Sequence, residues 1–176
     1  MKTETNRMAL SAVLLCVGLV LPLLTMQIKE IGDTLLPMHL PVLLCGILCG
    51  PFYGGSVGLI LPFLRSAIFG MPPIYPNAVW MAAELMAYGL ITGLVFSRTR
   101  KNIGGIYVSL IAAMLGGRIV WGAVKALLLG VGQSRFTIAA FFTGGFVDAL
   151  PGIVLQLVLI PLLVKLIRSK SVDEKP

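Results

Sequence analysis

Two charged residues, Glu84 and Arg118, stand inside long apolar stretches of the sequence. A charge at membrane depth is costly, so such charges are usually paired and functional. With a helical rise of about 1.5 Å per residue, Glu84 lies roughly 10 Å below Asn77, and Arg118 about 12 Å below the outer surface of a roughly 30 Å hydrocarbon core. The two charges reach a similar depth, which predicts an ion pair. The alternative to a ligand site is a purely structural pair.

Polar and aromatic residues recur around this predicted pair. Residues three, seven or eleven positions apart share one face of a helix, and this spacing relates Asn77, Trp80, Glu84 and Tyr88 in one segment and Arg118, Trp121 and Lys125 in the other. Together they predict a cavity, open to the outside, for a small polar molecule. The full set of candidate substrate-binding residues is His39, Arg65, Asn77, Trp80, Glu84, Tyr88, Arg118, Trp121, Lys125, Asp148 and Gln156.

The charge balance of this predicted cavity favours an anionic or zwitterionic ligand. Its candidate cations are Arg65, Arg118, Lys125 and Arg135, and its candidate acids are Glu84 and Asp148. Arginine and lysine bind carboxylate and phosphate groups through charge-assisted hydrogen bonds. A surplus of cations therefore suits a ligand with an acidic group.

Other chemistries lack their motifs. The sequence has no G-x-x-x-x-G-K-[ST] phosphate-binding loop, no H-E-x-x-H and no G-x-S-x-G, so ATP hydrolysis is not expected on this chain and an enzyme is the minor interpretation. Cys16, Cys45 and Cys49 all lie in apolar segments, where free cysteine usually packs as a small hydrophobic residue. We therefore expect neither a metal site nor a cofactor.

The amino-acid composition indicates whether water or lipid surrounds most of the chain. It is 57% hydrophobic and 12% charged, and its mean hydropathy is +0.97. A soluble domain of 176 residues exposes too much of its surface to water to hide so many apolar side chains. The sequence predicts an all-α integral membrane protein, and its excess of Lys and Arg therefore does not indicate a nucleic-acid partner.

Segment lengths predict six transmembrane helices in a single bundle, forming one transmembrane domain over residues 1–176. The expected helices span roughly residues 8–27, 41–50, 55–69, 77–96, 106–129 and 141–167. Leu35–Leu40 is expected to be irregular, residues 50–55 to form a tight turn, and residues 168–176 to form a disordered tail. The first apolar run lacks a signal-peptide cleavage site, so we expect it to be retained.

Six helices place both termini on one side of the membrane. That side collects most of the basic residues: Lys2, Arg7, Arg98, Arg100, Lys101, Lys165, Arg168, Lys170 and Lys175, against Lys29, Arg65 and Arg135 on the other side. The positive-inside rule makes the richer side cytoplasmic, an N-in/C-in topology. The proline-rich turn between Arg65 and Asn77 then faces outward and is expected to act as a gate over the ligand site.

Several stretches resemble a known family. They are residues 36–44 (LPMHLPVLL), 50–54 (GPFYG), 70–73 (GMPP), 84–89 (ELMAYG) and 118–122 (RIVWG). With its size and six segments, the chain resembles the substrate-binding S components of energy-coupling factor (ECF) vitamin transporters, most of all the pantothenate-type branch. The resemblance implies a multi-pass protein of the bacterial cytoplasmic membrane that captures a vitamin from outside, with a membrane coupling (T) protein and two cytoplasmic ATPases as partners.

Helix one of this family commonly docks on the coupling protein through small residues spaced as Ala-x-x-x-Ala. The nearest match here is Ala12 and Cys16, with Ala9 nearby, so the resemblance implies these three as docking residues. The sequence leaves the identity of the vitamin open. Alternatives from other classes are a stand-alone secondary carrier for a small anionic solute and, less favoured, a membrane enzyme.

Overall fold

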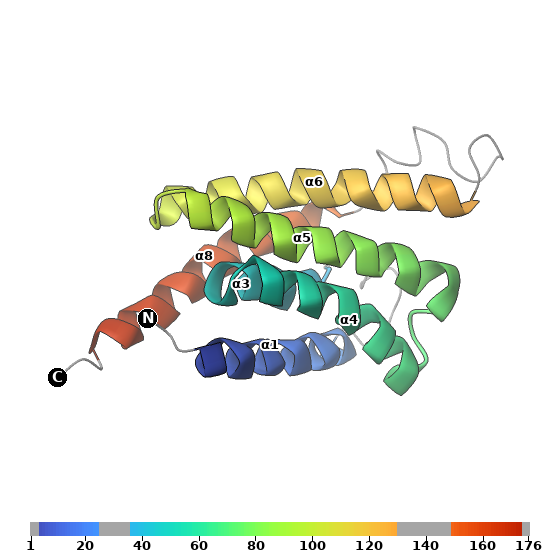
Figure 1. Cartoon of the computed structure of the whole chain (residues 1–176), viewed down its shortest axis with the longest axis horizontal. Coiled ribbons are helices and arrows are strands. Elements are labelled where there is room, and N and C mark those ends of the chain that lie inside the picture. The colour runs from blue at the N-terminus through green and yellow to red at the C-terminus, as the bar shows by residue number, and fades with distance from the viewer. Residues whose placement is uncertain (1–3, 25–35, 130–148, 174–176) are drawn as a thin grey trace.

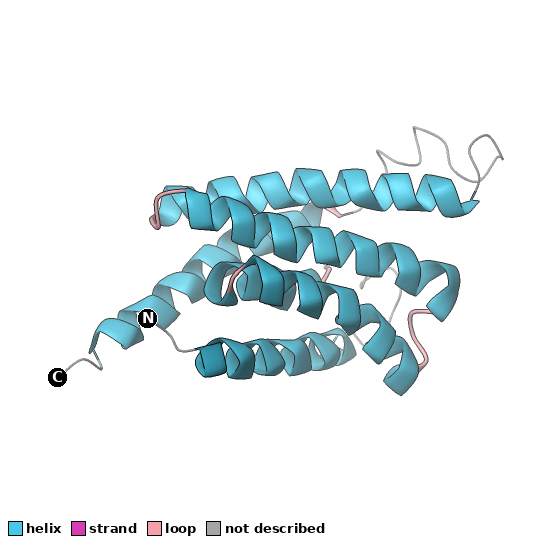
Figure 2. Cartoon of the chain, in the orientation of Figure 1, coloured by secondary structure: helices cyan, strands magenta, loops and turns pink. Residues whose placement is uncertain are grey.

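A computed structural model describes residues 4–24, 36–129 and 149–173 of the chain, and these residues are helical almost throughout (Figures 1 and 2). The helices are α1 (Glu4–Leu24), α3 (His39–Cys49), α4 (Pro51–Phe69), α5 (Val79–Arg98), α6 (Ile103–Leu129) and α8 (Leu150–Asp173). A distorted wide turn, η1 (Ile74–Ala78), leads into α5, with Tyr75 extended inside it. The part of the chain described here contains no strand.

Five of these helices are long and apolar enough to cross a membrane. The exception is α3, whose 11 residues span only about 16 Å at a helical rise of roughly 1.5 Å per residue. Large apolar side chains such as Leu115, Ile119 and Val158 are exposed on the outside of the bundle, as expected where lipid is the solvent. The all-α membrane fold predicted from composition is confirmed.

Helix α5 lies at the centre of the bundle and packs against α3, α4 and α6. Glycines bring the α4 and α5 backbones together. A Cβ atom on Gly89 would lie 2.2 Å from the backbone of Gly54, and one on Gly58 would lie 2.3 Å from the carbonyl oxygen of Leu85. Gly54 and Gly58 on α4, like Gly89 and Gly93 on α5, follow the G-x-x-x-G spacing that permits close helix contact.

The predicted turn over residues 50–55 is wrong, because one residue makes the turn. Gly50 has φ +104°, in the left-handed region that glycine adopts without strain. Pro51 begins α4 directly, where its fixed φ suits the first helical turn and its missing N–H is not needed. Gly54 stays helical and packs closely on α3, since a Cβ atom added to it would lie 2.7 Å from the Cα atom of Gly46. Thus α3 and α4 form a tight helical hairpin.

Helix α5 begins at Val79, two residues later than predicted, because η1 occupies residues 74–78. Several other helix ends lie beyond the apolar segments that were used to predict them. Helix α1 begins at Glu4 and α8 continues to Asp173, while α5 reaches Arg98 and α6 begins at Ile103. Helical hydrogen bonding continues into water, and Glu, Lys and Arg are good helix formers. The expected disordered tail is therefore helical as far as Asp173. The predicted start of the last helix, residues 141–148, lies outside the described residues.

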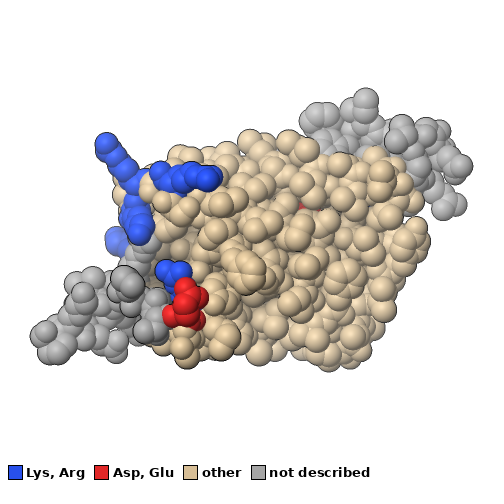
Figure 3. Space-filling view, viewed as in Figure 1, with Lys and Arg blue, Asp and Glu red and all other residues tan. Residues whose placement is uncertain are grey.

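Both described ends of the chain lie at the same end of the bundle (Figure 1). Figure 3 shows Lys and Arg gathered at that end, while the rest of the visible surface carries little charge. Exposed Arg98, Arg100 and Lys101 lie there, where α5 ends and α6 begins. Residues 70–78, here called the outer turn, lie at the opposite end. By the positive-inside rule the charged end is expected to face the cytoplasm.

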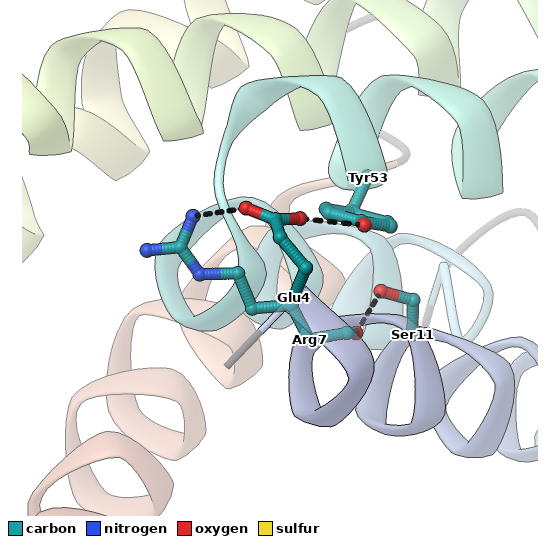
Figure 4. Close-up of polar contacts among 4 residues, drawn as sticks. All are labelled: Glu4, Arg7, Ser11 and Tyr53. Carbon is teal, nitrogen blue, oxygen red and sulfur yellow. Dashed lines mark hydrogen bonds and ion pairs between the residues drawn. The ribbon is translucent and has the colours of Figure 1, made fainter. Parts of the chain in front are cut away.

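At the charged end, a small polar cluster ties α1 to the start of α4 (Figure 4). The Tyr53 hydroxyl donates a hydrogen bond of 2.9 Å to Oε2 of Glu4. Arg7 Nη1 lies 3.6 Å from Oε1 of the same carboxylate. The hydrogen bond joins two residues that are 49 positions apart in the sequence, and so fixes the N-terminal end of α1 against the α3–α4 hairpin.

Candidate functional site

The candidate site is built on α5, which buries an acidic and an aromatic side chain one helical turn apart. Glu84 is 2% exposed and Tyr88 is 1% exposed. Residues four apart lie on the same face of a helix. Small residues let the α4 and α5 backbones touch, which fixes the position of α5. Helices α3 and α6 also pack against α5, and Glu84 and Tyr88 lie between them. The carboxylate thus sits in the protein interior and not in lipid.

Helix α6 brings Arg118 to this carboxylate. Arg118 Nη1 lies 3.0 Å from Oε1 of Glu84, and both side chains are almost fully buried. The ion pair predicted from helix depth is present. Gly117 makes the approach of α6 possible, since an added Cβ would lie 2.7 Å from the ring of Tyr88. Sequence reasoning missed Gly117, although a glycine beside a buried arginine was a visible signal.

Helix α3 contributes His39 at its first turn. His39 Nε2 lies 3.5 Å from Oε1 of Glu84, and its ring meets Tyr88 edge-on, with ring centroids 4.9 Å apart. The side chain is 3% exposed. His39 was predicted as a wall residue on an irregular segment. It instead begins the regular helix, and three helices converge on the Glu84 carboxylate.

Two tryptophans and a lysine form the next layer of the site. Lys125 Nζ lies 4.4 Å from the centre of the Trp121 ring and 5.3 Å from that of Trp80. The guanidinium carbon of Arg118 lies 5.8 Å from the Trp121 ring centre. Both cations therefore lie against the Trp121 ring, a favourable electrostatic contact. The four residues were predicted to share the site, and the structure brings them together.

The remaining predicted residues are distributed more widely. Gln156 is 1% exposed, and its Nε2 donates to the Leu36 carbonyl at 3.5 Å, which links α8 to the segment before α3. Asn77 lies half-buried in η1, just before α5. Asp148 lies outside the described residues.

Several buried polar atoms of the site have no hydrogen-bond partner among the described residues. They are Nδ1 and Nε2 of His39 and Nε and Nη2 of Arg118. Leaving a buried polar group unbonded costs about 1–3 kcal/mol, so native structures keep few of them. Four such nitrogens in one cluster make it the candidate place for the polar groups of a ligand.

Cysteine does not extend this site. Cys45 and Cys49 are buried among the apolar side chains of the core, as their predicted packing role requires. In the part of the chain that the structure covers, no group of three or more His, Cys, Asp or Glu residues could hold a metal ion.

Arg65 has contacts of another kind. It is 4% exposed, and its Nη1 donates a hydrogen bond of 3.0 Å to the Leu19 carbonyl of α1. Its guanidinium carbon lies 5.5 Å from the centre of the Phe69 ring. Arg65 was predicted as one of the cations that bind an anionic ligand. Its contacts give it a structural role, joining α4 to α1, and ligand binding by Arg65 stays a prediction.

We expect Arg65→Ala to lower the thermal unfolding midpoint of the purified protein by about 3–6 °C, the effect of losing one charge-assisted hydrogen bond of about 1.5 kcal/mol in a chain of this size. Arg65→Lys, which keeps a donor and the charge, should recover at least half of the loss. An unchanged midpoint in the alanine variant would show that the contact with Leu19 does not stabilise the α1–α4 packing.

Comparison with known proteins agrees with this architecture. The family model for the substrate-specific component of ECF transporters matches residues 6–164, which covers at least part of every described helix and all of the cluster around Glu84. Searches of curated proteins and of solved structures returned no match. Because the family model covers nearly the whole chain, the protein belongs to the ECF transporter substrate-specific components.

Proposed function

We propose that this S component captures a small water-soluble vitamin from outside the cell, with pantothenate or a similar acidic vitamin as the best candidate, and delivers it inward across the bacterial cytoplasmic membrane. Membership of the family makes the chain the substrate-binding subunit of an ECF transporter, which works with a T subunit and ATPase subunits. The chain itself is therefore a transporter subunit and not an enzyme.

The observation that carries the proposal is the buried cluster of His39, Glu84 and Arg118, with its four unbonded nitrogens. A small polar solute needs a few fixed hydrogen-bonding groups and an apolar wall. Trp80 and Trp121 supply the wall, and both lie against a cation. Arginine and lysine beside one carboxylate favour a ligand with an acidic group.

The outer turn supports entry from outside. It joins α4 to α5 at the end of the bundle opposite the charged end, and Met71, Ile74 and Tyr75 in it are exposed. We propose that this turn gates the site. Its prolines, Pro72, Pro73 and Pro76, limit its conformations and so reduce the entropy lost when it closes on a ligand.

Uptake of labelled pantothenate separates this proposal from its alternatives. Cells without their own pantothenate uptake should accumulate the vitamin when this chain is co-produced with a coupling protein and two ATPases, and not when it is produced alone. Accumulation by the chain alone, abolished by an ionophore, would indicate a secondary carrier. Failure to accumulate any of the water-soluble vitamins with the full module would contradict the proposal.

Helix α1 is proposed as the docking face for the coupling protein. Ala9, Ala12 and Cys16 are all exposed on it, whereas Ser11 and Leu14 face inward and are buried. Small side chains let a partner helix approach closely. The Glu4–Tyr53 hydrogen bond and the Arg65 contact with Leu19 hold both halves of α1, so its outer face is presented as a rigid surface.

Replacing Ala12 with Trp is expected to reduce uptake by the complete transporter about tenfold or more, because the large ring keeps the partner helix at a distance. Ligand binding to the isolated chain should change less than about twofold, since the substitution lies outside the Glu84 cluster. Leu115→Trp is the matched control, because Leu115 lies on α6 and is 52% exposed. It should leave both uptake and ligand binding unchanged. Normal uptake by the Ala12 variant would exclude this face as the docking surface.

A further inference from the structure

The guanidinium of Arg118 presents two different edges. Its Nη1 atom faces Glu84 Oε1 at 3.0 Å. Its Nε and Nη2 atoms are buried and have no hydrogen-bond partner among the described residues. The N–H groups of these two nitrogens point in parallel, and this edge of arginine can donate two hydrogen bonds to one carboxylate at the same time. Glu84 therefore uses one part of the guanidinium and leaves a bidentate donor pair.

From this geometry we infer that the Nε–Nη2 edge of Arg118 is the seat for a carboxylate of the transported molecule, which makes the protein selective for carboxylates over their neutral amide or alcohol analogues. The inference rests on the proposed function of substrate capture at this site. It adds the atoms that recognise the substrate and the chemical class that they select.

The surroundings of Arg118 favour a charged group over a neutral one. Lys125 lies over the same Trp121 ring as Arg118, 4.4 Å from its centre, and adds a second cation to the site. Hydrogen bonds with an ionised donor or acceptor are roughly twice as strong as neutral ones, and a carboxylate also brings a full negative charge to the guanidinium, which a neutral acceptor does not. In a buried site the difference is large, because water competes little for either partner.

Glu84 acts in this arrangement as a positioning residue. It holds Nη1 of Arg118 and approaches His39 Nε2 at 3.5 Å, so the guanidinium plane is fixed by contacts from α5. A guanidinium fixed in one plane loses little side-chain entropy when a planar carboxylate binds. His39, whose two ring nitrogens also lack hydrogen-bond partners in the described part of the site, is placed to bond a second polar group of the same ligand.

Two pairs of probes test the inference in the purified full chain. Pantothenate and panthenol differ only in having a carboxylate or a hydroxymethyl group. Calorimetry should give panthenol a dissociation constant at least about 30-fold above that of pantothenate, the effect expected for a charged bidentate pair. In Arg118→Lys the charge stays but the pair of parallel donors is lost, so the ratio of the two dissociation constants should fall below about threefold. Arg98→Lys, an exposed arginine at the charged end, is the matched control and should keep the full ratio.

The second pair, propionate and propionamide, does not depend on which vitamin is transported. Propionate should shift the Arg118 Nε–Hε resonance in ¹⁵N NMR spectra, identified by its loss in Arg118→Lys, and propionamide should leave it in place. If both probes or neither shifts the resonance, or if panthenol binds as tightly as pantothenate, the carboxylate seat is excluded. If propionate shifts it while no vitamin binds, the carboxylate seat stands and the vitamin proposal fails.

Discussion

Replacement of Arg118 by Ala is expected to weaken binding of the transported vitamin by about 100-fold or more, because a buried, charge-assisted contact of about 3 kcal/mol is lost. Arg118 lies 3.0 Å from Glu84 and carries two further buried donors. Glu84→Gln should also weaken binding, by about tenfold, because the guanidinium loses the charge that fixes its orientation. Calorimetric titration of each purified variant measures both effects.

Folding must be separated from recognition in this experiment. Removing one partner of a buried ion pair typically costs about 3–5 kcal/mol of stability, since the other charge stays buried alone. The double variant Glu84→Gln, Arg118→Met removes both charges at similar volume, and it should recover most of the lost thermal stability while still failing to bind. Unchanged affinity in both single variants would exclude the paired charges from the ligand site, whatever their effect on stability.

Gly89→Ala is expected to have the largest effect on the fold. A Cβ atom there would lie 2.2 Å from the backbone carbon and oxygen of Gly54, and a backbone cannot move aside as a flexible side chain can. The α4–α5 contact must separate, which also displaces Glu84 from α3 and α6. We expect a loss of about 3 kcal/mol or more and a fall of about 10 °C in the thermal unfolding midpoint.

Gly104→Ala is the matched control for this substitution. Gly104 lies in the first turn of α6, and an added Cβ would meet only a side-chain atom of Asn102 at 3.6 Å, an ordinary contact. Alanine is also the better helix former, so the control should be neutral or slightly stabilising. Equal unfolding midpoints for the two alanine variants would mean that the α4–α5 backbones do not pack as closely as the structure has them.

The sequence was sufficient for the fold class and for the centre of the site. Apolar composition required lipid as solvent, and the rise of a helix placed Glu84 and Arg118 at one depth, where the ion pair is found. The spacing of Trp80, Trp121 and Lys125 on their helices was enough to bring them to that pair. These predictions depend on local periodicity, which a single sequence carries.

Features that depend on contacts between distant segments were not predicted. The glycines at 54 and 89 were visible as G-x-x-x-G spacings, yet only the packing of α4 on α5 shows that they face each other. The turn at residues 50–55 was expected because glycine and proline usually interrupt helices, whereas tertiary packing keeps all but Gly50 helical. Arg65 was counted among the ligand-binding cations because its actual partner, the Leu19 carbonyl, lies 46 residues away in the sequence, where local patterns do not reveal it.

The central claim is that the buried cluster of His39, Glu84 and Arg118 belongs to a high-affinity site for a small water-soluble vitamin. Isothermal titration calorimetry of the purified chain, without its partner subunits, tests it most directly. We expect one vitamin, pantothenate first among them, to bind with a dissociation constant below about 1 µM, which corresponds to more than about 8 kcal/mol of binding free energy. Absence of binding by every water-soluble vitamin at up to about 100 µM would contradict it.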